Sequence, residues 1–333
     1  MISGRCPPAG RLAAPHPAVF PRLPQSWYYA GQASALPRGA VMARRIGVRS
    51  LAIFRGEDGI AGAVEARCPH LGSDLARGRV AVNAVECPYH HFRFDRDGHC
   101  HQHALRTVAY AVEERFGALF VFLGARPPTF PLPSFDTDDL ISAPPLHWRL
   151  ETQWYMLGAN AFDARHFALA HGRHLTGPPS LSAPATHSLN VDYEYAIRGH
   201  GMIDRLIRLA SGPRVAFRVT AWGGTIILVR AKFARDESYG LVAVEPEGER
   251  ATNVTVIVSA RRTDTLAGRL LGNWLRSRLK RLAIRNMLLG DASALRSLDY
   301  AHEGLLSGDE TVAAFLIWVS GLPDGDKPGG LST

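Results

Sequence analysis

The sequence predicts an α+β fold with two domains: a small all-β domain, then a domain that combines an antiparallel sheet with a long C-terminal helix. Three observations lead to this expectation. Short β-rich runs fill the first third of the chain, a proline-dense segment follows them, and helical periodicity then brackets a series of alternating runs. We expect a flexible arm rich in Pro and Arg at residues 1–25, a first domain at 26–125 and a second domain at 126–333.

The first domain should consist of short strands. Its β-rich runs are separated by Gly, Pro and Asp, which is typical of a small all-β domain. Two loops between these runs, residues 68–72 and 87–91, carry cysteine and histidine. Residues 126–134 are dense in proline, which prevents regular structure and marks the domain boundary. The predicted strands are residues 48–54, 62–66, 80–86, 92–95, 107–113 and 118–122.

The second domain should begin and end with a helix. Residues 153–174 have few helix breakers and apolar side chains at near-helical spacing, so they predict one irregular helix. Residues 265–298 return to helical periodicity with an apolar stripe. Between them, alternating runs predict antiparallel strands at residues 189–197, 215–221, 225–233, 239–245 and 252–260.

Composition indicates a globular protein in a reducing compartment. The longest apolar runs are much shorter than the roughly twenty residues of a membrane helix. The first 25 residues lack the continuous apolar core of a secretory signal. Of the four cysteines, Cys6 and Cys100 have no obvious partner, so a disulfide framework is not expected. We therefore expect no membrane span and a cytoplasmic location.

The formal charge of +8 does not indicate nucleic-acid binding, because the arginines are spread along the chain without a basic tail or interleaved aromatic residues. Arg77, Arg79, Arg93 and Arg96 lie close in sequence to the two cysteine- and histidine-bearing loops. They would attract an acidic redox partner. Each one is equally compatible with an ordinary solvated arginine.

Two paired ligand sets occupy these loops, Cys68-Pro-His70 and Cys87-Pro-Tyr-His90. Two thiolates and two imidazoles are the ligands of a Rieske [2Fe–2S] cluster, with Cys68 and Cys87 on one iron and His70 and His90 on the other. Imidazoles raise the potential above that of an all-cysteine cluster, which suits accepting an electron and passing it on. Zinc is the alternative, but structural zinc sites usually space each ligand pair by two to four residues.

A second metal site is indicated by His166 and His171 at the end of the first predicted helix. Two histidines and one carboxylate form the facial triad of non-haem iron(II) oxygenases. Asp291 stands among apolar neighbours in the long helix, where a buried charge would be costly unless paired or bound to a metal. It is our choice for the carboxylate.

Alternatives to this triad remain open. Asp299 and Glu303 are fallback carboxylates, and His174 is a rival for His171. A histidine pair on an apolar helix is more often a packing feature than a metal site. Asp291 would in that case be solvated on the polar edge of its helix.

These motifs resemble those of the terminal oxygenase subunits of Rieske non-haem iron oxygenases, of the α-only, ring-hydroxylating or demethylating type, from about Trp27 to the end. The most specific parts are residues 68–72, residues 87–90 and the spacing of Asp163, His166 and His171. The resemblance implies a helix-grip fold around a mononuclear iron, with Asp291 completing the triad. It also implies a head-to-tail homotrimer, in which Asp163 bridges a cluster histidine and an iron-ligand histidine of two subunits and orients both.

The resemblance further implies a reaction. Electrons from NADH or NADPH would pass through a ferredoxin or flavin reductase to the cluster and then to Fe(II), where O2 is activated to hydroxylate or dealkylate a substrate. We favour monooxygenation over dioxygenation by this analogy. The rival interpretation is a Rieske electron-transfer protein whose second domain binds a ligand without oxidising it.

The substrate is expected to be a hydrophobic, aromatic small molecule. The expected pocket is apolar, although its residues are equally compatible with an ordinary core. Arg214 and Arg230 are weak candidates for pairing with a substrate carboxylate. The pocket would be lined by residues 156–167, Phe217, Trp222, Ile227, Val229 and the long helix.

The chain departs from the family pattern in two places. Family members usually have Gly after the second cluster histidine, where this chain has His91, and an acidic residue or Gln before the triad carboxylate, where it has Gly290. In addition, His99, His101 and His103 alternate along a predicted strand or loop. Three alternating histidines can bind a metal, but a solvated strand face is the more common arrangement.

Overall fold

The computed structural model describes residues 11–198, 201–262, 272–296 and 298–325. They form two compact units. One contains Leu23–Ser134 and residues 323–325, and the other contains Phe135–Leu322 and residues 11–22. Cys6 and part of the predicted arm lie outside the described residues, as do residues 263–271 and 297 of the predicted C-terminal helix.

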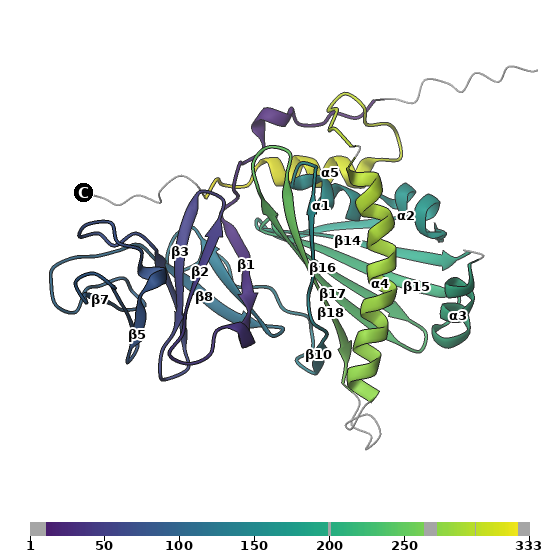
Figure 1. The fold of residues 1–333 in the computed structure, drawn as a ribbon. Helices are drawn as coiled ribbons and strands as arrows, with labels where there is room; N and C mark the ends of the chain where they lie inside the picture. Colours follow the sequence, from purple (N-terminus) through teal and green to yellow (C-terminus); the bar gives the residue numbers. More distant parts are fainter. Residues whose placement is uncertain (1–10, 199–200, 263–271, 297, 326–333) are drawn as a thin grey trace, which may run out of the picture. The chain divides into compact units, whose positions relative to one another are not determined.

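The first unit is built on a six-stranded antiparallel sheet in the order β1-β9-β8-β4-β3-β2 (Figure 1). Every residue of its strand β9 is buried, since the strand lies between two neighbours and is covered on both faces. The predicted all-β character of this part is confirmed. The strands are β1 (Ser26–Gln32), β2 (Val41–Ile46), β3 (Arg49–Arg55), β4 (Ala61–Glu65), β8 (Ala109–Arg115) and β9 (Ala118–Leu123).

A smaller three-stranded sheet carries the second ligand loop. Its strands are β5 (Arg79–Ala81), β6 (Ala84–Glu86) and β7 (Arg93–Phe94), in the order β5-β6-β7. The expected single strand at residues 80–86 is wrong, because Val82 takes a left-handed φ of 60° and the chain reverses there into a hairpin. Short 3-10 helices are η1 (Pro17–Val19), η2 (Ala33–Ala35) and η3 (Leu75–Arg77).

The second unit contains a nine-stranded antiparallel sheet in the order β10-β18-β17-β16-β15-β14-β12, with β11 paired to β18 and β13 to β14. The five strands predicted from alternation correspond to β14–β18, and the four short strands β10–β13 were not predicted. The strands are β10 (Leu140–Ser142), β11 (Leu146–Leu150), β12 (Arg173–Leu175), β13 (Ser180–Ala185), β14 (Ser188–Ile197), β15 (Arg214–Trp222), β16 (Ile226–Phe233), β17 (Glu237–Pro246) and β18 (Thr252–Arg261).

Helices of this unit position the second site. The long helix α4 (Asn273–Leu295) runs across one face of the sheet, as predicted for a C-terminal helix (Figure 1). The single helix expected at residues 153–174 is wrong: α1 (Tyr155–Ala161) and α2 (Ala164–His171) replace it. The remaining helices, α3 (Met202–Ser211) and α5 (Glu310–Ser320), were not predicted. In the described part of the chain, every helix is too short or too polar to cross a membrane.

Candidate metal centres

The two loops that carry the cluster motif share one backbone design. In the first, the N–H of Gly72 donates to the carbonyl of Cys68 at 2.9 Å, and in the second, the N–H of His91 donates to the carbonyl of Cys87 at 3.0 Å. Both donors take a left-handed conformation, with φ of 78° at Gly72 and 60° at His91. Glycine adopts this conformation without steric cost, whereas histidine does not. The departure at His91 therefore places a side chain at a position that favours glycine.

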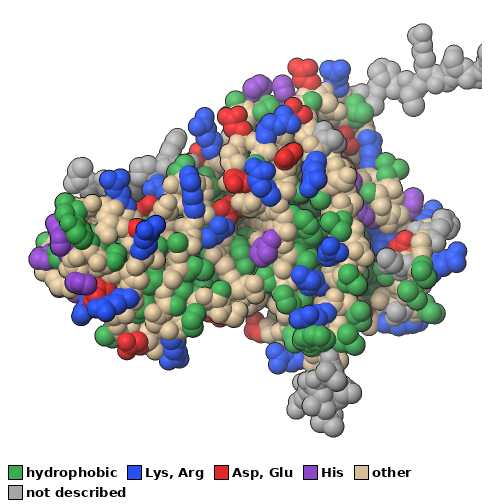
Figure 2. Space-filling view, viewed as in Figure 1, with side chains coloured by type: hydrophobic (Ala, Val, Ile, Leu, Met, Phe, Trp, Pro, Cys, Tyr) green, Lys and Arg blue, Asp and Glu red, His purple; other side chains and the backbone are tan. Residues whose placement is uncertain are grey.

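The four donor side chains are suited to a cluster. Nδ1 of His70 and Nδ1 of His90 lie 3.1 Å apart. Two nitrogens that bind one tetrahedral ion at typical lengths are separated by about 3.3 Å, so both can serve one iron. Cys68 and Cys87 are 2% and 1% exposed, whereas both histidines are exposed. Figure 2 shows histidine side chains beside hydrophobic and basic ones at the edge of this unit near β5 and β7.

The environment of the two thiols differs. Burial is the main cause that raises the pKa of the Cys68 thiol. Burial also acts on Cys87, but hydrogen bonds from the backbone of Tyr89 and His90 outweigh it and lower the pKa of that thiol. Metal ligation requires the thiolate, and N–H groups that point at sulfur favour the thiolate.

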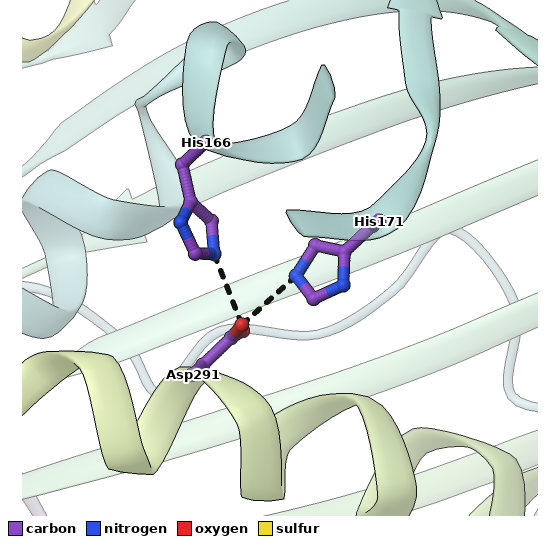
Figure 3. Close-up of side chains that lie close together, drawn as sticks. All are labelled: His166, His171 and Asp291. Carbon is purple, nitrogen blue, oxygen red and sulfur yellow. Dashed lines mark hydrogen bonds and ion pairs between the residues drawn. The ribbon is translucent and has the colours of Figure 1, made fainter. Parts of the chain in front are cut away.

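The second donor set is brought together from α2 and α4 (Figure 3). Nε2 of His166 lies 3.0 Å from Oδ1 of Asp291, and Nε2 of His171 lies 2.9 Å from the same oxygen. The side chains of His166, His171 and Asp291 are 17%, 10% and 8% exposed. Although Nε2 of His171 is close to that oxygen, it is buried without a hydrogen bond to any described residue. A buried nitrogen of this kind fits a site that a metal would complete.

Within the triad, Asp291 favours the protonated form of His166, and the two histidines favour the ionised form of Asp291. The hydrogen bond that His166 donates to the Asp291 carboxylate is the main cause that raises the pKa of His166. Burial acts against ionisation of Asp291, but contacts with His166 and His171 outweigh it and hold the pKa of this carboxyl below its ordinary value. An ionised carboxylate beside two imidazoles is the donor set of a facial triad, which leaves positions open for O2 and substrate.

The break between α1 and α2 sets where the helix that carries His166 begins. Asp163 is the N-cap of α2, and its Oδ1 accepts a hydrogen bond from the backbone N–H of His166 at 2.9 Å. At the other end, Gly172 takes a left-handed φ of 59°, so the helix stops directly after His171. Asp163 is half-buried. Its expected role as a bridge between two subunits remains a prediction.

Helix α5 supports this break, and sequence reasoning missed its role. Oγ1 of Thr311 donates to the carbonyl of Phe162 at 2.6 Å, and the rings of Phe162 and Phe315 lie 5.0 Å apart. A Cβ on Gly158 would lie 2.0 Å from Phe315, so α1 approaches α5 as closely as glycine permits. The apolar run at residues 313–319 was the available signal.

The alternative triad residues lie elsewhere. Asp299 is exposed and pairs with Arg250 at 2.8 Å, while Glu303 is exposed and lies 4.0 Å from His302. His174 is exposed on β12. Among the described residues, His166, His171 and Asp291 are the one group of three or more His, Cys, Asp or Glu side chains whose ligand atoms all lie within 4.8 Å of one another, as a single metal ion requires. The alternating histidines His99, His101 and His103 therefore do not converge on a common point.

Several residues expected to face a partner or substrate are engaged within the chain. Arg77 lies 3.7 Å from Asp74, and Arg96 pairs with Asp58 at 2.5 Å. Arg79 and Arg93 both pair with Glu86. Each of the four arginines thus has a carboxylate partner, and Arg79 and Arg93 share a single one.

The residues expected to line a substrate pocket contribute to the core of the second unit. Met156, Phe167, Phe217 and Val229 are half-buried against it, and Ile227 is buried within it. Trp222 lies beside His187, with ring centroids 4.5 Å apart. Of the two arginine candidates, Arg230 pairs with Glu237 at 3.1 Å and Arg214 is exposed.

Comparison with known families identifies the first unit: residues 26–110 match the Rieske [2Fe-2S] domain. Curated relatives include aminopyrrolnitrin oxygenase PrnD of Pseudomonas fluorescens, 31% identical over 45% of this chain and 46% of that protein. The oxygenase component of chloroacetanilide N-alkylformylase of Rhizorhabdus wittichii is 26% identical over 48% of this chain and 50% of the relative. The chain thus spans about half the length of these relatives.

Solved structures show the same fold along most of the chain. Dicamba monooxygenase bound to dicamba superposes with a TM-score of 0.59 at 16% identity, covering 89% of this chain and 97% of that one. The NdmA QL mutant of Pseudomonas putida CBB5 with theobromine gives 0.65 at 17% identity, covering 88% of each chain. The domain match shows a Rieske [2Fe-2S] domain at residues 26–110, the two oxygenase relatives share part of the sequence, and the solved structures share the fold.

Proposed function

We propose that this protein is a terminal oxygenase that receives electrons from a reductase and uses them to hydroxylate or dealkylate a hydrophobic small molecule. The observation that carries the proposal is the second donor set. A cluster domain alone would serve electron transfer, whereas two half-buried histidines that converge on one carboxylate oxygen supply a separate centre with open positions.

The residues divide into two sets of ligands. Cys68, Cys87, His70 and His90 would hold the cluster, and His166, His171 and Asp291 would hold the mononuclear iron. When bound, the cluster supplies single electrons and the iron supplies a centre for O2 activation. The protein keeps both triad imidazoles aimed at one point by fixing the two ends of α2 at Asp163 and Gly172. Burial of Asp291 limits the access of water to its carboxylate.

Asp163 is proposed as the link between a cluster histidine of one subunit and the triad of the next within a homotrimer. Two observations support this role. His70 and His90 are exposed, so a neighbouring subunit can reach them, and Asp163 is half-buried beside the first turn of the ligand helix. A carboxylate that contacts two ligand imidazoles would orient both.

The substrate class and the reaction type are inferred by analogy. Dicamba monooxygenase shares the fold, and aminopyrrolnitrin oxygenase shares part of the sequence. The half-buried rings of Phe167 and Phe217 are in contact with each other. The ring of Phe167 lies 5.7 Å from that of His171, so aromatic side chains lie next to this ligand. We therefore propose monooxygenation of an aromatic compound in the cytoplasm, with reducing equivalents from NAD(P)H through a reductase.

Metal analysis of protein purified without air tests this function. The expected content is about three iron and two acid-labile sulfide per chain. Reduced protein should then consume O2 in a single turnover only when an oxidisable aromatic substrate is present. If the content is two iron and stays there after ferrous iron is added, the rival electron-transfer interpretation holds. Zinc without sulfide would overturn both.

A further inference from the structure

The buried side chain of Glu86 links the two ends of the second cluster loop. Glu86 directly precedes Cys87, and His91 directly follows His90. Oε1 of Glu86 lies 3.2 Å from Nδ1 of His91. The two residues that bracket the ligand loop are therefore in contact through their side chains. In the first loop, Gly72 stands at the position equivalent to His91 and offers no side chain for such a contact.

Both oxygens of Glu86 are also held by arginines. Glu86 lies on the central strand β6, directly opposite Arg79 on β5 and Arg93 on β7. Nε of Arg79 donates to Oε1 and Nε of Arg93 donates to Oε2, each at 2.8 Å. The side chain of Glu86 is only 2% exposed, whereas those of Arg79 and Arg93 are 74% and 46% exposed. Burial of a carboxylate is costly unless it is paired, and this one is fully paired.

The backbone at His91 is held in its unfavourable conformation by more than this contact. Nε2 of Gln102 donates to the carbonyl of His91 at 3.1 Å, and Oε1 of the same Gln102 accepts from the N–H of Arg93 at 2.9 Å. Non-glycine residues remain in the left-handed region when their surroundings determine the conformation. Glu86 and Gln102 together fix His91, and with it the position of the adjacent ligand His90.

We propose that Glu86 is a positioning residue for the cluster, which holds the ligand loop through His91 and keeps the reduction potential below the value that Arg79 and Arg93 alone would set. A fixed negative charge one residue from Cys87 disfavours addition of an electron, and the two guanidinium groups favour it. The single charge of Glu86 offsets one of their two positive charges within one hydrogen-bonded group. The inference rests on the cluster domain and not on the proposed oxygenase reaction.

The experiment is a redox titration of the cluster in the intact purified protein, without substrate or reductase. Glu86→Gln preserves the shape and removes the charge. The ratio of reduced to oxidised cluster at a fixed potential should rise about tenfold, which is 59 mV for one electron. Arg93→Gln removes a positive charge from the same group and should shift the ratio in the opposite direction. Glu86→Asp keeps the charge and should remain close to the parent, as should the exposed control Glu57→Gln.

Glu86→Gln and Arg93→Gln are expected to shift the ratio of reduced to oxidised cluster in opposite directions. This difference in direction distinguishes the proposal from a purely structural role of Glu86. If Glu86→Gln lowers only the melting temperature, and the clusters that it retains titrate like the parent, the proposal is overturned. If this variant takes up no cluster, Arg93→Gln still decides: a ratio that is unchanged or raised also overturns it. A shift as large in Glu57→Gln would assign the effect to overall charge and reject the role of Glu86.

Discussion

The two metal centres differ in how far apart in sequence their ligands lie and in how much solvent reaches them. The four cluster ligands fall within residues 68–90, on two loops of one domain, and the two histidines are exposed. The triad joins α2 to Asp291, 120 or more residues later, and its three side chains are at most 17% exposed. An exposed edge suits exchange of electrons with a partner, and a buried centre suits chemistry from which water is excluded.

The largest expected effect comes from removing the distant carboxylate. Asp291→Ala should abolish turnover and lower the iron content by about one per chain, because two imidazoles alone hold iron weakly. The visible spectrum of the cluster should survive, since its ligands belong to the other unit. The matched control is Asp299→Ala, an exposed carboxylate of the same region. Turnover that persists in Asp291→Ala with iron still bound would show that the triad is misassigned.

A smaller effect should follow from Asp163→Asn, which tests whether the two centres communicate through this residue. Both metal centres should remain, because Asn caps a helix about as well as Asp. Transfer of electrons from the reduced cluster to the iron should slow by about 10–100-fold, the usual cost of losing a carboxylate that orients ligand histidines. Rapid-mixing spectroscopy measures this rate. An unchanged rate would reduce Asp163 to its observed role as helix N-cap.

The smallest effect concerns stability in the metal-free protein. The lowered pKa of Asp291 makes its contribution present above about pH 3.9 and lost as pH falls through the lower folded value. The raised pKa of His166 makes its contribution present below about pH 6.5 and lost as pH rises through the higher folded value. Asp291→Asn should therefore cost about 1.5–3 kcal/mol near pH 5.5 and less near pH 9. Denaturant unfolding at both pH values measures the difference, and an equal cost at both would contradict the ion pair.

Sequence patterns predicted the parts of the fold that repeat regularly. Alternation located β14–β18, because these long strands carry apolar side chains into the core of the second unit; buried positions alternate in β14, whereas β18 is buried on both faces. Strand β13 escaped prediction because all but one of its residues are exposed, so it lacks a buried face. The sequence predicts one helix in place of α1 and α2, because their apolar spacing continues across Phe162. Asp163, which caps α2, was interpreted as part of the metal chemistry and not as a helix N-cap.

The donor sets were accessible to sequence reasoning for different reasons. The cluster motif is local, and its residue types are specific in themselves. Asp291 was singled out because a charge among apolar neighbours needs a partner, and the structure places it between His166 and His171. The group around Glu86 could not be predicted, because it depends on the register that sets Arg79 and Arg93 opposite one another across β6.

The close approach of α1 to α5 has a consequence for the order in which the protein matures during synthesis. The strands β1–β9 are complete once residue 123 has been made, so the cluster domain can begin to fold early. The segment that carries His166 and His171 must wait for Thr311 and Phe315, which are translated about 140 residues later. A nascent chain can therefore contain a folded cluster domain well before its second centre can form.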